Sequence, residues 1–274
     1  MNARTVETEA DLQTLLRPES ERTFRGQSNA SWKLESTLER AAKNNYGETF
    51  RQYLSEFEAC AIDQFIDRCK RLELDDLYRP NTLPDGSDTF QWLSLMQHHG
   101  SPTRLIDFTD DVWVALYFAL RGANPSIPFA IYELQMLPGD DAGNKLPKDS
   151  NGQVYRVPAG SGLPNVNELL GKVINFRHFQ SRKCRYDATP LGQEWSSPRQ
   201  NYGLDAPKIQ NVRIERQRGR SLYQVILDGQ IDNAVHLTKH TISARLQATT
   251  RSMLQTRGIR YTKEFLFPSF EENT

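Results

Sequence analysis

Long apolar runs, a cysteine framework and net charge are all missing from this chain of 274 residues. No segment approaches the roughly 18–20 consecutive apolar residues that a membrane-spanning helix needs. The first residues are polar and acidic, unlike those of a signal or transit peptide. We therefore expect a protein that acts in the cytoplasm and not at a membrane.

Cysteine occurs three times, at Cys60, Cys69 and Cys184, and no CxxC pair is present. Cys60 and Cys69 fall in one helix-like stretch, where a rotation of about 100° per residue points them to opposite faces. The sequence therefore excludes a disulfide framework and disfavours a structural zinc site. A GxGxxG motif is also missing, which disfavours hydride transfer on a Rossmann fold.

The formal net charge is zero, but the charged residues are unevenly distributed. Residues 171–263 contain 17 Lys and Arg against 6 Asp and Glu, and the remainder of the chain carries the balancing excess of acid. Such asymmetry is typical of a surface that meets a polyanion. Neutralisation of one half by the other inside the fold explains it equally well.

The apolar pattern predicts an α+β protein, with helices first and a mostly antiparallel sheet later. Helices are expected at residues 8–16, 36–42, 48–72, 89–99, 110–121 and 243–257. Strands are expected at residues 22–26, 103–108, 129–134, 173–179, 212–227 and 264–267. No linker divides the chain, so we expect a single domain over residues 1–274 with its core at about 22–270.

Two segments place polar residues where a core strand should end. The first is Phe24-Arg25-Gly26-Gln27, followed by Trp32. An arginine at a strand end can present its planar fork to a phosphate or a carboxylate. Gly26 would let the backbone approach a ligand closely. The alternative is a structural ion pair of Arg25 that holds the strand end.

The second segment, QHHGSPTRLIDFT, runs from Gln97 to Thr109. Strand alternation gives one face three polar residues and a leucine, and so a candidate wall of a site: Thr103, Leu105, Asp107 and Thr109. Thr109 also suits a helix N-terminus, where it would cap free amides. His98 and His99 diverge by about 100° on a helix, which makes them poor joint metal ligands.

These two segments, together with Ala115-Leu116-Tyr117-Phe118-Ala119, resemble the FRG domain, a family named for its Phe-Arg-Gly motif. Looser matches at Arg177-His178-Phe179-Gln180 and in the tail from Gly258 to Pro268 extend the resemblance to roughly residues 24–270. By its order of elements the chain is also similar to the ADP-ribosyltransferase superfamily. The resemblance implies the fold of that superfamily, N-terminal helices followed by a mostly antiparallel split sheet.

In that superfamily an Arg or His on the first strand holds NAD, a second strand bearing Ser or Thr runs into a helix, and a Glu or Gln on a later strand orients the reaction. The resemblance therefore implies an NAD-dependent ADP-ribosyltransferase without a metal. It implies a catalytic set of Arg25, Asp107, Thr109 and Gln180, with Glu264 as the alternative to Gln180. The residues implied to bind NAD are Arg25, Gly26, Gln27, Trp32, Thr103, Arg104 and Tyr117.

Such an enzyme would be an intracellular toxin or defence effector that modifies a macromolecule, with a neutralising antitoxin protein as an expected partner. The basic region favours single-stranded RNA as the acceptor, because phosphates meet cations and aromatic rings stack on unpaired bases. The residues expected to contact RNA are Lys172, Arg177, Arg182, Lys183, Arg185, Arg213, Arg216, Arg218 and Arg220. Two alternatives stay open: a non-enzymatic nucleic-acid or nucleotide-binding module, and a nuclease that uses His98, His99 and Asp107.

Overall fold

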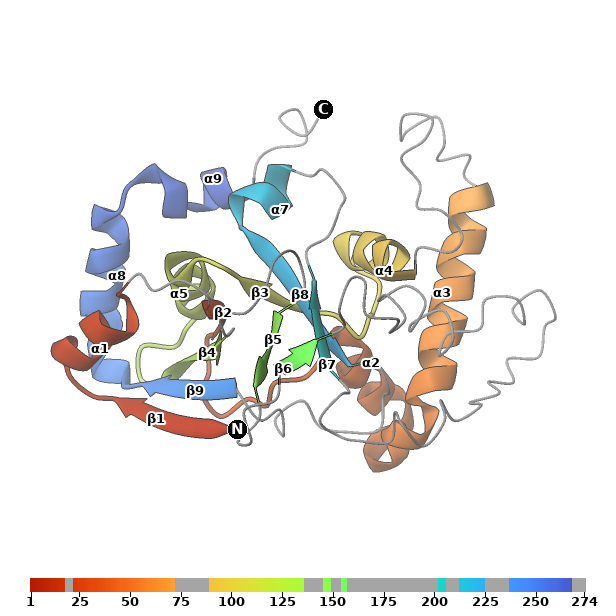
Figure 1. Cartoon of the computed structure of the whole chain (residues 1–274), viewed down its shortest axis with the longest axis horizontal. Helices are drawn as coiled ribbons and strands as arrows, with labels where there is room; N and C mark the ends of the chain where they lie inside the picture. Colours follow the sequence, from red (N-terminus) through yellow and green to blue (C-terminus); the bar gives the residue numbers. More distant parts are fainter. Residues whose placement is uncertain are drawn as a thin grey trace.

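The described residues form a seven-stranded sheet in the order β1-β9-β4-β2-β3-β8-β7 (Figure 1). The computed structural model describes residues 1–17, 22–71, 89–135, 145–148, 154–156, 202–205, 212–224 and 237–267. The strands of the sheet are β1 (Asn2–Val6), β2 (Arg22–Gln27), β3 (Ile106–Thr109), β4 (Phe129–Gln135), β7 (Tyr202–Asp205), β8 (Gly219–Gln224) and β9 (Leu237–Ile242). Neighbours are antiparallel except β1 and β9, which are parallel, so the expected mostly antiparallel sheet of an α+β protein is confirmed.

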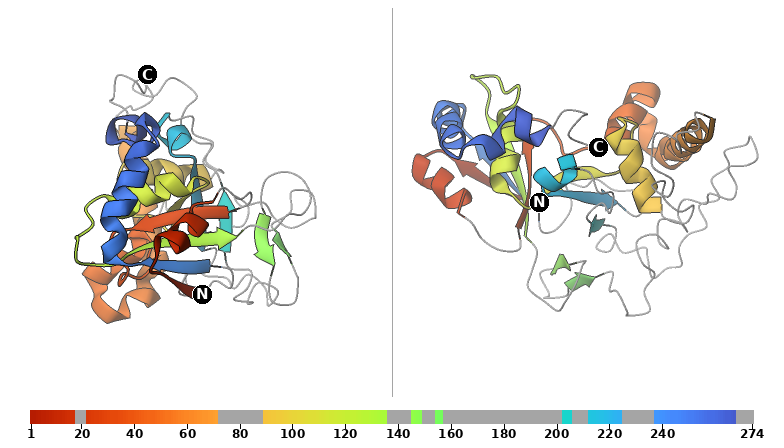
Figure 2. Two further views of the ribbon diagram at one scale, coloured as in Figure 1. Left: turned by 90° about the vertical axis from the view of Figure 1, so that its left-hand side faces the viewer. Right: turned by 90° about the horizontal axis from the view of Figure 1, so that it is seen from above.

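A separate two-stranded ribbon joins β5 (Lys145–Lys148) to β6 (Val154–Arg156). The α-helices are α1 (Glu9–Leu15), α2 (Thr37–Tyr46), α3 (Leu54–Arg71), α4 (Thr89–His98), α5 (Val112–Leu120), α7 (Val212–Arg216), α8 (Gln247–Thr256) and α9 (Lys263–Leu266). Short 3₁₀ turns are η1 (Gly47–Tyr53), η6 (Ala244–Leu246) and η7 (Ile259–Tyr261). Helices thus interleave with the strands and do not all precede the sheet. Figures 1 and 2 show α1 and α8 at one end of the molecule and α3 and α4 at the other.

Each face of the sheet carries its own apolar core, because successive side chains of a strand point to opposite sides. Phe24 of β2 packs with residues of α1 and α5 in a cluster of Val6, Leu12, Leu15, Leu16, Phe24, Val112, Ala115, Leu116, Ala119, Leu120, Phe129, Ile131, Ile242 and Leu246, against which Met253 and Leu254 of α8 also pack. Phe108 of β3 belongs to the cluster of Leu34, Ile106, Phe108, Ala130, Tyr132, Leu134, Leu222 and Leu237. The two motif strands are therefore anchored in the core.

Local capping signals place the first helices where the sequence predicts them. The Thr8 hydroxyl accepts from the amide of Asp11 at the start of α1, and the Asp11 carboxylate accepts in return from the amide of Thr8. Ser36 and Glu39 form the same reciprocal arrangement at α2. Such capping boxes satisfy amides that have no partner inside the helix.

Two expectations about secondary structure need correction. Residues 212–216 form α7 rather than the beginning of a strand, and of the described residues 212–224 only 219–224 are extended. Residues 263–266 form α9 instead of a final strand, because the Thr262 hydroxyl accepts from the amide of Phe265 and caps a helical turn. Short apolar runs do not distinguish strand from helix by periodicity alone. The strand expected at residues 173–179 lies outside the described residues.

The sheet opens between β2 and β3. Strand β2 pairs with β4 over six residues, from Arg22 to Gln27, but it pairs with β3 at a single position, Phe24 opposite Thr109. Beyond that position the two strands carry no further ladder pairs. The sheet is thus continuous in order but splits at the strands that bear both sequence motifs.

Candidate functional site

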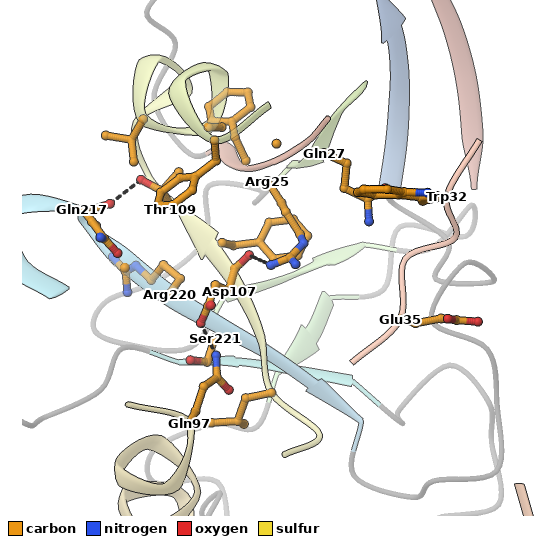
Figure 3. A pocket seen from close by; sticks show the side chains of 18 of the residues that line it. Arg25, Gln27, Trp32, Glu35, Gln97, Asp107, Thr109, Gln217, Arg220 and Ser221 are labelled. Carbon is orange, nitrogen blue, oxygen red and sulfur yellow. Dashed lines mark hydrogen bonds between the residues drawn. The ribbon is translucent and has the colours of Figure 1, made fainter. Parts of the chain in front are cut away.

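A pocket of about 880 Å³ lies where β2 and β3 separate. Its walls come from β2, the loop that follows β2, α2, α4, β3, α5 and the start of β8. This volume falls in the range of roughly 300–1,000 Å³ that is typical of small-molecule sites. Figure 3 shows Arg25 and Asp107 at the centre of the pocket, with Trp32 and Glu35 on one side and Arg220 and Gln217 on the other.

Arg25 crosses the opening of the sheet. Its Nη1 donates to the main-chain carbonyl of Asp107 at 2.7 Å. Burial lowers the pKa of the Arg25 guanidinium, the Asp107 carboxylate opposes this shift, and Arg40 adds to it. The Nε of Arg25 is buried and has no hydrogen-bond partner among the described residues. An unsatisfied buried donor is costly, so an acceptor brought by a ligand would relieve it.

The Asp107 carboxylate is exposed to the pocket and held by a side chain from α4. The Nε2 amide of Gln97 donates to Asp107 Oδ1, and the Thr103 hydroxyl donates to Gln97 Oε1 at 2.7 Å. Because Oε1 of Gln97 already accepts from Thr103, the side chain turns its Nε2 toward Asp107 and its Oε1 away from it. Thr103 itself is fully buried and does not line the pocket. It acts on the site through Gln97.

Thr109 lines the pocket and also begins the turn into α5. Its hydroxyl donates to the main-chain carbonyl of Gln217 at 2.6 Å and accepts from the amide of Asp111 at 3.1 Å. Asp111 is the N-cap of α5, where its carboxylate accepts from the amide of Trp113. Helix α5 thus begins at Val112, two residues after the expected start, and its N-cap is Asp111 and not Thr109. The single hydroxyl proton of Thr109 is already used inside the chain.

Gly26 is pressed against α5. A Cβ added at Gly26 would lie 1.9 Å from the carbonyl oxygen of Ala115 and 2.6 Å from the amide nitrogen of Ala119. No side chain fits there, so the glycine of the first motif and the alanines after the second motif form one close contact between strand and helix. Gly26 also lines the pocket.

Gln27 and Trp32 form one edge of the pocket. Gln27 is 8% exposed; its Nε2 donates to the carbonyl of Lys33 at 3.2 Å, and its Oε1 is buried without a partner among the described residues. Trp32 is 54% exposed. Its main-chain carbonyl accepts from the Tyr132 hydroxyl and from Lys239 Nζ, which hold this loop against the sheet. An exposed indole at the rim of a pocket can stack on a planar ring.

Several predicted site residues are not brought to the pocket. Arg104 is 1% exposed and forms a bidentate pair with Glu58 of α3. Tyr117 lies on α5 and Glu264 on α9, and neither lines the pocket. Gln180 lies outside the described residues.

The basic residues around α7 are partly used inside the chain. Arg216 donates to the carbonyl of Phe265 at 3.2 Å and lies over its ring. Arg220 pairs with the Asp110 carboxylate at 2.8 Å and lines the pocket, whereas Arg218 is exposed. Arg213 is the second residue of α7. The other residues expected to contact RNA, Lys172, Arg177, Arg182, Lys183 and Arg185, lie outside the described residues.

Sequence reasoning missed part of the pocket wall, which includes Lys33, Glu35, Arg40, Lys43, Gln97, Gln217 and Ser221. The spacing of three between Arg40 and Lys43 was a usable signal, because it puts both on one face of a helix. Nothing in the sequence marks Gln217 or Ser221, since they reach the pocket through the pairing of β8 with β3.

Two features are lacking from the described part of the chain. No helix there is long and apolar enough to cross a membrane. Among the same residues, no three His, Cys, Asp or Glu side chains are grouped so that they could hold a metal ion.

The comparison with protein families bears on the same part of the molecule. No curated protein and no solved structure matches the chain. Residues 20–126 match the family model of the FRG domain. This span contains β2, α2, α4, β3 and α5, which form most of the pocket wall. The match supports the FRG family for the region of the chain that carries Arg25, Gly26 and Asp107.

Proposed function

We propose that this chain is an NAD-dependent ADP-ribosyltransferase-like enzyme with its site in the pocket between β2 and β3. The observation that carries the proposal is that Arg25 and Asp107 line one pocket in the opening of the sheet, where Arg25 donates to the main-chain carbonyl of Asp107 and the Asp107 carboxylate acts on the guanidinium as a nearby charge. A fixed cation suits an anionic diphosphate, and a carboxylate suits a centre that becomes positive. The order of elements supports the same reading, because β3 bears Thr109 and leads into α5 next to β2.

The residues of the pocket fit NAD in chemical type. The unsatisfied Nε of Arg25 would donate to a phosphate oxygen, and the unsatisfied Oε1 of Gln27 would accept from an amide or amino group. Trp32 would stack on one of the two rings. NAD would supply the ADP-ribosyl group: its bond between ribose C1′ and nicotinamide breaks with the electrons leaving on nicotinamide, while the acceptor bonds to C1′ and releases a proton.

The protein's own contribution is electrostatic. Asp107 would face the positive charge that develops on the ribose, as glycosidase carboxylates do. Gln97 keeps that carboxylate in one orientation. Arg25 would neutralise phosphate charge and hold the reacting group in place. Gln180 stays a prediction as the third catalytic group.

The excess of basic residues between 171 and 263 supports single-stranded RNA as the acceptor. In this proposal the enzyme is a toxin or defence effector, and an acidic antitoxin would cover the same basic surface. Near α7 the exposed Arg218 remains for this role, because Arg216 and Arg220 have partners in the chain, and Arg213 stays a prediction from the sequence.

The test is to incubate the purified chain with adenylate-labelled NAD and cell lysate, and to measure both nicotinamide release and transfer of label. We expect both from the wild type and neither from Arg25→Ala. Arg4→Ala is the matched control, because Arg4 is an exposed arginine of β1 outside the pocket. The proposal fails if the wild type releases no nicotinamide and transfers no label, or if Arg25→Ala matches Arg4→Ala.

A further inference from the structure

Three cationic side chains line the pocket on the side of α2. Lys33 comes from the loop after β2, and Arg40 and Lys43 come from α2 itself. All three are exposed. We name Lys33, Arg40 and Lys43 the cationic shoulder; the residues implied to bind NAD or RNA include none of them.

The fold holds the shoulder in one orientation. Leu38 and Ala42 are fully buried on one face of α2, and the spacing of three between Arg40 and Lys43 puts these two on another face. The capping box at Ser36 fixes the start of the helix. Arg40 is further tied by its Nη1, which donates to the carbonyl of Glu35 at 2.7 Å.

The charges of the shoulder are not neutralised by the described part of the protein. No carboxylate of the described residues forms an ion pair with Lys33, Arg40 or Lys43. Other arginines differ: Arg104 is paired with Glu58 and Arg220 with Asp110. Unpaired cations that line a pocket favour the binding of an anion.

The shoulder and Arg25 face the same space. All four cations line one pocket, and the positive charge of Arg40 contributes to lowering the pKa of Arg25. Like charges that share a pocket repel each other. An anion bound between them attracts each cation, and this attraction offsets the repulsion. Among the described residues of the pocket wall, the carboxylates are Glu35 and Asp107, against the cations Arg25, Lys33, Arg40, Lys43 and the paired Arg220.

We propose that the cationic shoulder and Arg25 together bind the diphosphate of a nucleotide. A small ligand is favoured over a polymer because Arg25 lies inside the opening of the sheet, and its unsatisfied Nε is buried. The rim beside the shoulder offers Trp32 for a ring and Gln27 Oε1 for a donor on that ring. This inference rests on the proposed function only for the identity of the nucleotide.

One consequence concerns the direction in which the ligand lies. Figure 3 places Trp32 and Glu35 on one side of Arg25, and Arg220 and Gln217 on the other. A diphosphate held on the α2 side leaves the β8 side, next to the exposed Arg218, open for the acceptor. Asp107 lies between the two, at the place where the group would be transferred.

The experiment measures binding without chemistry. Titration calorimetry of the full chain uses ADP-ribose and inorganic pyrophosphate as the two probes. The test variant is Lys33→Ala with Arg40→Ala and Lys43→Ala. Each charge-assisted contact to a phosphate is strong, so we expect both probes to bind at least about tenfold more weakly. Circular dichroism melting confirms that the variant is folded.

A matched control removes the same number of positive charges elsewhere. Arg4→Ala with Arg260→Ala and Lys263→Ala changes three exposed cations that do not line the pocket. We expect this control to bind both probes as the wild type does. If the shoulder variant binds ADP-ribose like the wild type, or if the control loses as much affinity, the shoulder is not a diphosphate site.

Two further outcomes separate this inference from its rivals. If the shoulder variant loses affinity for a single-stranded RNA oligonucleotide while it retains ADP-ribose binding, the shoulder contacts a polymer and the inference is overturned. If ADP-ribose binds through the shoulder but the wild type cleaves no NAD, the inference stands and the proposed transferase activity fails.

Discussion

The Nη1 of Arg25 on β2 donates a hydrogen bond of 2.7 Å to the main-chain carbonyl of Asp107 on β3, across the opening between these strands. A side chain thus connects the strands at a position where the ladder has ended. The contact brings the guanidinium next to the residue that offers its carboxylate to the pocket.

Replacing Arg25 by lysine tests the need for a planar guanidinium. Arg25→Lys keeps the charge but loses the fork that reaches Asp107 and presents Nε at the same time, so ADP-ribose binding should fall by about tenfold or more. Calorimetric titration measures it, with Arg4→Lys as the control. Equal affinity of Arg25→Lys and the wild type would show that charge alone is sufficient at this position.

Gly26→Ala should destabilise the fold. The new Cβ would lie 1.9 Å from the carbonyl oxygen of Ala115, so β2 and α5 must move apart at a cost of about 1–3 kcal/mol or more. Urea unfolding measures the change. Gly219→Ala is the control, because its Cβ would first meet the Ile214 methyl at 3.3 Å, and its effect should stay within about 1 kcal/mol.

The buried pair of Arg104 and Glu58 makes a second stability prediction. Glu58→Ala leaves a guanidinium that is 1% exposed without its carboxylate, and the free energy of unfolding should fall by about 3–5 kcal/mol. Glu7→Ala removes the exposed pair with Arg245 and should cost less than about 1 kcal/mol. If both variants lost a similar free energy of unfolding, burial of the Arg104–Glu58 pair would not explain its contribution to stability.

Glu133 should make stability depend on pH in the acidic range. Burial raises its pKa, but the hydrogen bond and charge of His240, with Arg22, outweigh burial and hold the pKa below 4.5. A lowered folded-state pKa means that the stabilisation is present above pH 4.5 and is lost as the pH falls through the folded value. Glu133→Gln should therefore cost about 1–3 kcal/mol at pH 7 and progressively less in acid. Urea unfolding across pH checks this, and a cost that does not vary with pH would refute it.

Thr103→Val tests whether Gln97 positions Asp107. Valine has the same shape but cannot donate to Gln97 Oε1, so the amide can turn away from the carboxylate. If the proposed transferase activity holds, kcat for nicotinamide release should fall by about tenfold, with KM for NAD unchanged. Thr103→Ser keeps the hydroxyl and should restore kcat. A parallel change in KM, or no rescue by serine, would assign Thr103 a structural role only.

Much of the local structure was predictable because its causes are local. Thr8 and Ser36 lie at helix starts, where their hydroxyls accept from amides three residues ahead. The turn residues that follow residues 22–26 helped to predict β2, and the apolar residues of 129–134 predicted β4. The same reasoning missed β1 and β9, which pair in parallel although more than 230 residues separate them. No pattern within a short window reports a partner at that distance.

Some features of the candidate site follow from the local sequence, and others depend on contacts between distant elements. The sequence alone determined that Arg25, Gln27, Asp107 and Thr109 stand at the ends of strands, because alternation and turn residues mark those ends, and all four line the pocket. Only the tertiary structure decided that Arg104 is enclosed with Glu58, that Thr103 acts through Gln97, and that α2 brings its cations to the pocket. A residue's face follows from its own strand or helix. What that face contacts depends on which distant elements pack against it. Here the separation of β2 from β3 determines which side chains line the pocket.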